Sequence, residues 1–148
     1  MRIALGADDS PALIDVIANF LTQSGHHVTR FGKAAGQSES WGATGQRVAE
    51  SVASRAHDLG VVCCWTGTGI SIAANKVPGV RAALCVDAET ARGARKWNDA
   101  NVLALSLRLT SEPLALEILQ AFLAEPYAGS EDESLAVLAA LDARGAGS

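Results

Sequence analysis

Residues 63–76 have the sequence Cys63-Cys64-Trp65-Thr66-Gly67-Thr68-Gly69-Ile70-Ser71-Ile72-Ala73-Ala74-Asn75-Lys76, and they follow the apolar run Leu59-Gly60-Val61-Val62. The apolar run is typical of a buried strand, and the two glycines allow a sharp turn and a close approach to a ligand. Ser71 is expected to cap the helix that follows. Because a strand, a tight turn and a helix start direct free N–H groups at one point, we predict an anion site there, with Cys64 and Thr66 at its edge.

The glycine spacing of this stretch matches neither of two common phosphate-binding motifs. It lacks the third glycine of the dinucleotide fingerprint and the Gly-Lys-Ser/Thr end of a P-loop. Glycine-rich turns also follow strands in many α/β proteins without forming a site. The adjacent residues Cys63 and Cys64 point to opposite faces of a strand, so at most one of them faces the site, and the other is expected to be a buried hydrophobic residue.

Composition limits the class of protein. The 148 residues are expected to form one domain, 1–148, and 49% apolar with 5% aromatic residues is typical of alanine-rich helices on an aliphatic parallel sheet. A net charge of −4 argues against nucleic acid as a partner. No apolar run is long enough to span a membrane, and the first residues have a strand pattern rather than that of a signal peptide. The three cysteines fit neither a disulfide framework nor zinc spacing, so we expect a reducing cytoplasm and no metal.

Segments with strand and helix patterns alternate along the chain. The predicted strands are 3–7, 27–31, 59–62, 80–86 and 102–107, and the predicted helices are 10–24, 44–57, 72–76, 88–97, 112–123 and a last one after the acidic residues 131–133. This alternation predicts an α/β fold with a five-stranded parallel sheet, helices on both faces and a C-terminal helix. Ligands of such folds collect at the carboxyl ends of the strands, where Asp8, Asp9, Cys64 and Thr66 lie.

The last predicted helix has an apolar stripe formed by Leu135, Leu138 and Leu141. Two interpretations of the stripe are open. The helix either covers the core of its own chain or reaches across to a partner subunit.

Three segments of the chain resemble one family. The run from Thr66 to Lys76, Gly79-Val-Arg-Ala82 and Asn98-Asp-Ala-Asn101 together resemble type B ribose-5-phosphate isomerase, whose family includes the galactose-6-phosphate isomerase subunits. The similarity extends in order from Ile3 to about Tyr127. It implies a three-layer Rossmann-like fold, a homodimer or dimer of dimers with sites at the subunit interface, and no metal or organic cofactor. It also implies aldose–ketose isomerisation of a sugar phosphate through a cis-enediolate.

The resemblance also assigns roles to residues of this chain. It implies that the Cys64 thiol carries the proton between C1 and C2, which suits a thiolate near a helix N-terminus. The implied contacts to the sugar are the Thr66 hydroxyl and the Asp8 carboxylate, with Asn98 supplied by the partner subunit. The hole for the enediolate oxygen is assigned to the backbone amides of Gly67, Thr68, Gly69, Ile70 and Ser71.

At several positions the chain departs from the family pattern. Asp9 replaces a histidine near the phosphate, and Trp97 replaces the ring-opening histidine. An indole N–H cannot accept or shuttle a proton, so Trp97 is a candidate for substrate contact only. Ser40-Trp41-Gly42 replaces Asp-Tyr-Pro. Glu131 and Leu135 replace two arginines that hold phosphate, which leaves Arg108 as the matching phosphate-side arginine.

These departures predict a changed substrate. A sugar that cannot cyclise, such as a four-carbon sugar phosphate, needs no ring-opening histidine, and an unphosphorylated sugar needs no arginine clamp. The alternative is a sugar- or metabolite-binding paralogue without catalysis, although binding alone would not require Cys64. Trp41, Trp65 and Trp97 are expected either in the core or together as a wall of the site.

Overall fold

The computed structural model of the protein describes residues 1–146. Its five strands form one parallel sheet in the order β2-β1-β3-β5-β4, which confirms the predicted α/β fold. The elements in chain order are β1 (Arg2–Ala7), α1 (Ala12–Gln23), β2 (His27–Gly32), the 3₁₀ turn η1 (Lys33–Ala35), α2 (Trp41–Ala53), β3 (Leu59–Cys64), α3 (Thr68–Asn75), β4 (Ala82–Leu84), α4 (Ala88–Asn98), β5 (Val102–Ser106), α5 (Glu112–Ala124) and α6 (Asp132–Ala146).

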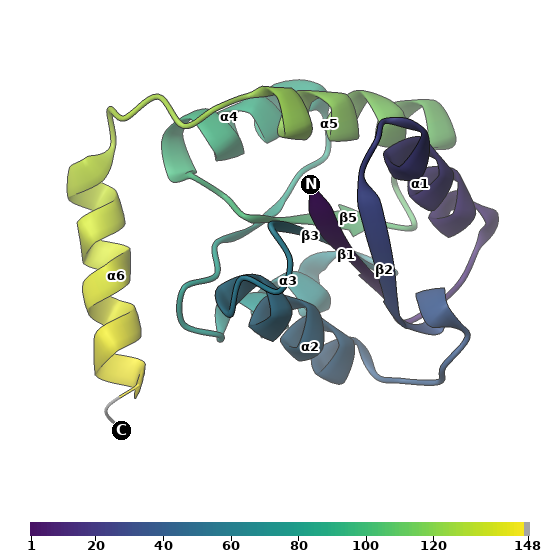
Figure 1. The fold of residues 1–148 in the computed structure, drawn as a ribbon, viewed down its shortest axis with the longest axis horizontal. Coiled ribbons are helices and arrows are strands. Elements are labelled where there is room, and N and C mark those ends of the chain that lie inside the picture. The colour runs from purple at the N-terminus through teal and green to yellow at the C-terminus, as the bar shows by residue number, and fades with distance from the viewer. Residues whose placement is uncertain (147–148) are drawn as a thin grey trace.

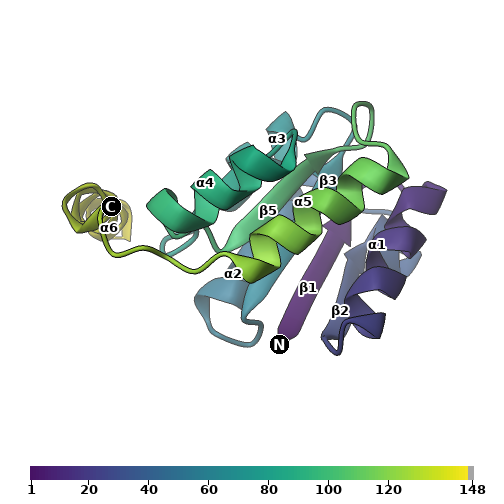
Figure 2. The ribbon, with the colours of Figure 1, turned by 90° about the horizontal axis from the view of Figure 1, so that it is seen from above.

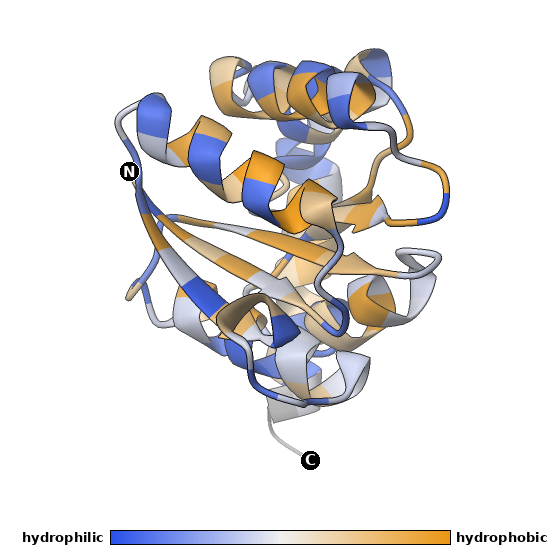
Figure 3. Ribbon diagram, turned by 90° about the vertical axis from the view of Figure 1, so that its right-hand side faces the viewer, coloured by the Kyte–Doolittle hydropathy of each residue, from blue (hydrophilic) through white to orange (hydrophobic). Residues whose placement is uncertain are grey.

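The sheet lies between two layers of helices. Helices α1, α4 and α5 cover one face, and α2 and α3 cover the other (Figures 1 and 2). The strands are largely apolar, whereas the outer faces of the helices carry the hydrophilic residues (Figure 3). The two helix layers bury separate apolar clusters, one containing Ile3, Leu103 and Phe122 and the other containing Val48 and Ile70. Burial of this apolar surface on both faces explains why the central strands are aliphatic.

The sheet has a topological switch point between β1 and β3. From β1 the chain passes to β2 on one side and then returns to β3 on the other, so the two connecting helices leave the sheet on opposite faces. A crevice forms where the strand order reverses, and ligands of open α/β sheets bind there. The carboxyl ends of β1 and β3, with Asp8 and Cys64, meet at this crevice.

Several predicted boundaries were wrong for local reasons. Helix α2 begins at Trp41 rather than at residue 44, because the Ser40 hydroxyl accepts a hydrogen bond from the Ala43 N–H at 3.1 Å and caps the helix there. It ends at Ala53, before Arg55, whose φ of 64° breaks the helix. Strand β4 has three residues rather than seven, because it pairs on one side only, with β5.

Helix α3 begins four residues earlier than the sequence indicated, at Thr68 rather than at residue 72. Gly67 is its N-cap with φ 76°, so the chain enters the helix directly after the first glycine of the turn. A side chain at Gly67 would also place its Cβ 2.9 Å from the Leu105 carbonyl carbon. Ser71 lies inside the helix, and the prediction that it caps α3 was wrong.

Helix α6 stands apart from both helix layers (Figures 1 and 2). Its stripe residues Leu138 and Leu141 are 41% and 52% exposed, so the helix does not cover the core of its own chain. The Gly79 N–H donates a hydrogen bond to the Asp142 carboxylate of α6 at 2.8 Å. Within residues 1–146 no helix is both long enough and apolar enough to cross a bilayer.

Candidate active site

A pocket of about 270 Å³ opens at the switch point of the sheet. Its lining residues come from the end of β1, the first turn of α2, the end of β3 and the start of α3, and they are Asp8, Trp41, Cys64, Trp65, Thr66, Thr68 and Gly69. The fold thus brings together a carboxylate, a thiol, two hydroxyls and a helix N-terminus from segments more than fifty residues apart. Five of the predicted site residues meet in this pocket, and they are Asp8, Cys64, Thr66, Thr68 and Gly69.

The adjacent cysteines lie on opposite faces of β3, as the sequence indicated. Cys64 belongs to the cluster under α2 and α3 and lines the pocket. Cys63 is completely buried in the cluster on the other face of the sheet. Burial, and to a smaller extent the charges of Cys64 and Asp8, raises the pKa of the Cys63 thiol to about 12. Cys63 therefore stays protonated and serves packing, and Cys64 is the thiol that a ligand can reach.

The N-terminus of α3 supplies the backbone donors of the pocket. The first residues of a helix have no carbonyl four positions earlier in the helix, so the N–H groups of Thr68, Gly69 and Ile70 are free to bind an anion. The Ser71 N–H differs, because it donates to the Gly67 carbonyl at 3.3 Å. Ser71 was predicted to contribute its amide to the anion hole, and the structure shows that this amide is already used by the helix.

The indole of Trp41 lies against the first turn of α3. A Cβ added to Gly69 would be 3.1 Å from the ring atoms Cδ2 and Cε3. Gly69 thus makes room for this ring. The sequence suggested that the glycine allows a ligand to come close, whereas the group that comes close is the Trp41 indole. Trp41 is 48% exposed and Trp65 is 63% exposed, so neither is a core residue. Both indoles are walls of the pocket.

A network of hydrogen bonds fixes the loop between β3 and α3. The Ser106 hydroxyl donates to the Trp65 carbonyl at 3.0 Å and accepts from the Leu109 N–H at 3.2 Å. The Arg108 N–H also donates to the Trp65 carbonyl, at 2.9 Å. Ser106 was not predicted as a site residue, although it is a single polar residue at the end of an apolar strand. Through these bonds β5 holds the backbone on which Trp65 and Thr66 stand.

The threonine hydroxyls of the pocket are in direct contact. Thr66 Oγ1 and Thr68 Oγ1 are 2.7 Å apart, and either can be the donor. Thr68 was predicted for its backbone amide alone. Its side chain is a further polar group of the pocket, and the repeated hydroxyl in Thr66-Gly-Thr68 was the signal for it.

The Asp8 carboxylate lines the pocket without a cationic partner among residues 1–146. Burial, followed by the nearby charge of Asp9, raises the pKa of Asp8, while its own backbone N–H opposes this shift. Asp9 is exposed and accepts a hydrogen bond from the Ser10 N–H at 2.8 Å. It does not line the pocket.

Comparison with known proteins shows which family has this arrangement. A profile described as Ribose/Galactose Isomerase matches residues 3–137. The chain belongs to the ribose/galactose isomerase family. Galactose-6-phosphate isomerase subunit LacB of Clostridium acetobutylicum is 41% identical over 128 residues, which are 86% of this chain and 74% of that protein. D-erythrulose-4-phosphate isomerase of Pectobacterium atrosepticum is 37% identical over 131 residues, which are 87% of this chain and 86% of that protein.

The fold of this family member is also shared with solved structures. Ribose-5-phosphate isomerase B of Clostridium thermocellum superposes with a TM-score of 0.91 at 39% identity, covering 97% of this chain and 99% of that one. The recognised family and the Rossmann-like α/β fold are therefore confirmed.

Besides Asp9, three residues that were predicted for the site do not line this pocket. Trp97 and Asn98 end α4 and line a different pocket, of about 470 Å³, beside β4. The Trp97 ring packs on Gly93, where an added Cβ would be 2.9 Å from Cζ3. The Arg108 side chain is exposed and does not line the Cys64 pocket, although its backbone touches Trp65. Of the three tryptophans expected together as a wall of the site, Trp41 and Trp65 line the Cys64 pocket of one chain and Trp97 does not.

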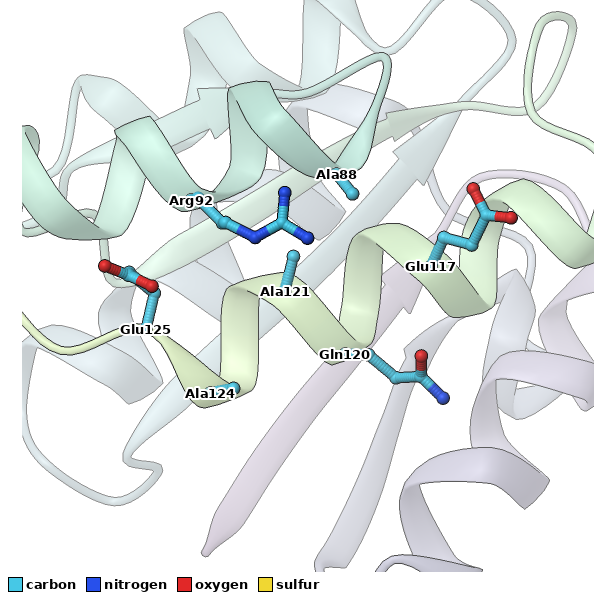
Figure 4. A pocket seen from close by; sticks show the side chains of 7 residues that line it. All are labelled: Ala88, Arg92, Glu117, Gln120, Ala121, Ala124 and Glu125. Atoms are coloured by element: carbon cyan, nitrogen blue, oxygen red, sulfur yellow. The ribbon is translucent and has the colours of Figure 1, made fainter.

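Another pocket, of about 360 Å³, lies between α4 and α5, away from the thiol. Its lining includes Arg92 on α4 and Glu117, Gln120 and Glu125 on α5 (Figure 4). Arg92 is already paired with Glu89 at 2.9 Å. Ala88, the first residue of α4, also lines this groove, but no thiol or hydroxyl of residues 1–146 does, so we do not assign it to the reaction. Within residues 1–146, no three His, Cys, Asp or Glu side chains are grouped so that they could bind a metal ion.

Proposed function

We propose that this family member is an aldose–ketose isomerase that acts on a small sugar phosphate through a cis-enediolate, with Cys64 as the proton carrier. The observation that carries the proposal is the position of the Cys64 thiol in one pocket with the free amides of α3. A base and an anion hole are the two elements that proton transfer next to a carbonyl requires.

The chemistry follows from these groups. The Cys64 thiolate removes a proton from the carbon next to the carbonyl, and the negative charge moves onto the carbonyl oxygen. The amides of Thr68, Gly69 and Ile70, with the positive end of the helix, stabilise this oxygen. The thiol then returns a proton to the neighbouring carbon. Asp8, beside the same pocket, accepts hydrogen bonds from the sugar hydroxyls.

The pocket supports a short, open-chain substrate. Two indoles wall a space of about 270 Å³, and within residues 1–146 no histidine lines it. The lining therefore lacks the histidine that the family resemblance assigns to ring opening. A four-carbon sugar phosphate has no ring to open, and one relative of the chain is named D-erythrulose-4-phosphate isomerase. We propose this substrate class, with Arg108 next to the pocket as a contact for the phosphate.

We further propose that a second copy completes the site, as a homodimer or a dimer of dimers. Trp97 and Asn98 do not line the Cys64 pocket of their own chain, so in this proposal a second copy supplies them. The exposed residues Val137, Leu138 and Leu141 of α6 offer an apolar stripe for that contact. The three buried free cysteines are in keeping with the proposed location in the cytoplasm.

The proposal is tested by comparing kcat/KM for D-erythrulose 4-phosphate, ribose 5-phosphate and their unphosphorylated sugars. We expect the four-carbon phosphate to exceed ribose 5-phosphate by at least about tenfold, which corresponds to about 1.4 kcal/mol of transition-state stabilisation. Ribose 5-phosphate as the best substrate would contradict the proposed change of specificity. Saturable binding of these sugars without conversion of any of them would indicate a binding protein and would contradict the activity itself.

A further inference from the structure

The threonine pair of the pocket points to a second proton path. Resting on the proposed isomerase activity, we propose that the Thr68 hydroxyl is a catalytic group that works with Thr66 to move the hydroxyl proton between the two oxygens of the substrate. The juxtaposition that carries this inference is the 2.7 Å contact between the two Oγ1 atoms in the pocket of Cys64.

Isomerisation requires two proton movements. A ketose has its hydroxyl on O1 and its carbonyl at O2, and the aldose has the reverse. One proton must therefore move from C1 to C2, and another must move from O1 to O2. Cys64 serves the carbon atoms in the proposed mechanism. A single thiol on one side of the substrate cannot also serve the two oxygens at the same time, so a separate donor and acceptor is needed for them.

The Thr68 side chain has no structural role that would explain its hydroxyl. It is the first residue of α3, but the N-cap is Gly67, and no side chain caps this helix. Among residues 1–146, the hydrogen-bond partner found for the Thr68 hydroxyl is the Thr66 hydroxyl. Thr68 is exposed and lines the pocket, so its hydroxyl retains a free hydrogen-bonding position for a ligand.

The geometry of the pair suits proton transfer in both directions. Two hydroxyls 2.7 Å apart form a hydrogen bond of ordinary length for O–H···O, and either oxygen can be the donor. Each threonine hydroxyl has one proton and two acceptor positions. When the hydrogen bond between them reverses, the pair accepts a proton at one end and releases a proton at the other. An isomerase works in both directions, from ketose to aldose and back. A hydrogen bond that can reverse meets this requirement.

The step balances without any other reactant. Cys64 takes the proton from C1, the C1–H electron pair forms the C1=C2 bond, and the carbonyl electrons move onto O2. One threonine hydroxyl gives its proton to O2 and takes the proton of the other threonine, which in turn takes the proton of O1. The C1–O1 carbonyl then forms as C2 takes a proton from the Cys64 thiol. Both hydroxyls and the thiolate regain their starting state.

The test uses the full-length protein with Thr68→Val, which keeps the shape of the side chain, and Thr68→Ser, which keeps the hydroxyl. D-erythrulose 4-phosphate is converted in D₂O, and deuterium is measured both in the aldose product and in the ketose that remains. A block at the oxygens leaves proton removal at C1 intact, so the enediolate returns to ketose more often than it goes forward.

We expect Thr68→Val to slow isomerisation at least about tenfold, which is less than the hundredfold or more usual for a general base because Thr66 keeps its hydroxyl. The ratio of deuterium in the remaining ketose to deuterium in the product should rise by a similar factor. Thr68→Ser should recover most of the rate and the wild-type ratio. An equal fall of exchange and conversion, an unchanged rate, or a Thr68→Ser variant as slow as Thr68→Val would overturn the inference. No conversion of any sugar phosphate by the wild-type protein would instead contradict the proposed isomerase activity.

Discussion

The two ends of the sheet differ in whether their polar groups are paired within the protein. At the amino end, charges are paired within the chain. The Arg2 guanidinium donates to Asp58 at 3.1 Å, the Arg2 N–H donates to the same carboxylate at 2.7 Å, and the N-terminal ammonium donates to His26 Nδ1 at 3.0 Å. At the carboxyl end, neither the Asp8 carboxylate nor the first amides of α3 pair with a charged side chain among residues 1–146.

This difference shows which end the chain uses for a ligand. Polar groups that pair with each other stabilise the fold. Groups without partners at a pocket contribute no such stabilisation until a ligand binds to them. Two of the three tryptophans, Trp41 and Trp65, are exposed at the carboxyl end, where both wall the pocket. Substitutions at the carboxyl end should therefore lower activity more than stability, and those at the amino end should do the reverse.

The largest effect is expected within the adjacent cysteines. Cys64→Ala should lower kcat at least about a hundredfold, the usual effect of removing a general base. Cys63→Ala, one residue away on the other face of β3, should keep turnover within about twofold, because it changes packing and leaves the pocket intact. Steady-state kinetics with matched thermal melts checks both variants. Full activity in Cys64→Ala would identify another base.

A smaller effect is expected where Trp41 packs on α3. Gly69→Ala puts a methyl group 3.1 Å from the Trp41 indole. The ring must then shift from its position in the pocket wall. We expect kcat/KM to fall about tenfold, or about 1.4 kcal/mol, with little change in the melting temperature.

A double-mutant cycle separates the ring from the helix. In a Trp41→Ala background there is no indole to displace, so Gly69→Ala should cost nothing further. The same loss in both backgrounds would mean that the methyl group acts on the amides of α3 directly and that the indole is not involved.

The smallest effects compare one carboxylate at each end of the sheet. Burial raises the pKa of Asp8, and hydrogen bonds from the Arg2 side chain and backbone N–H lower the pKa of Asp58. Ionised Asp8 therefore destabilises the folded state at neutral pH, and ionised Asp58 stabilises it. Asp8→Asn should raise Tm by about 1–2 °C at pH 7 while weakening substrate binding. Asp58→Asn should lower Tm and leave activity unchanged.

The pH dependence of these two variants has a defined sign. The stability that Asp8 contributes is fully present below the carboxyl pKa of about 4 in the unfolded chain, and it is lost as pH rises through the raised pKa of the folded state. The contribution of Asp58 is present above that value and is lost as pH falls through its lowered pKa. Both differences from wild type should shrink in acid, as thermal melts from pH 3 to 7 would show. Equal signs at pH 7 would contradict the contrast between the ends.

Much of the fold could be predicted from the sequence, because strand and helix patterns alternate clearly and each turn has its own breaker. The segment around Trp41 could not, since its polar, glycine-rich composition is typical of a loop and only the Ser40 cap shows that a helix begins there. The start of α3 was misplaced for a similar reason. Gly67, with its positive φ, is the N-cap of α3, the position that the sequence assigned to Ser71.

The candidate site was predictable in part. Cys64, Thr66 and Asp8 lie at strand ends, and the topology of a parallel sheet brings strand ends together. The Thr66–Thr68 contact and the packing of Trp41 on Gly69 depend on side-chain positions that spacing along the chain does not specify. The positions of Trp97 and Asn98 depend on a second copy in our proposal, and a single sequence contains no direct signal for that.

The most direct test of the proposed mechanism is the conversion of D-erythrulose 4-phosphate by the wild-type protein in D₂O, with the product examined by NMR. A thiol that takes the proton from C1 exchanges it with solvent before returning it, so we predict deuterium at C2 of the aldose product. Product that carries no deuterium at C2 even after many turnovers have brought the sugars to equilibrium would mean direct hydrogen transfer between the carbons, and the enediolate mechanism with Cys64 as proton carrier would be wrong.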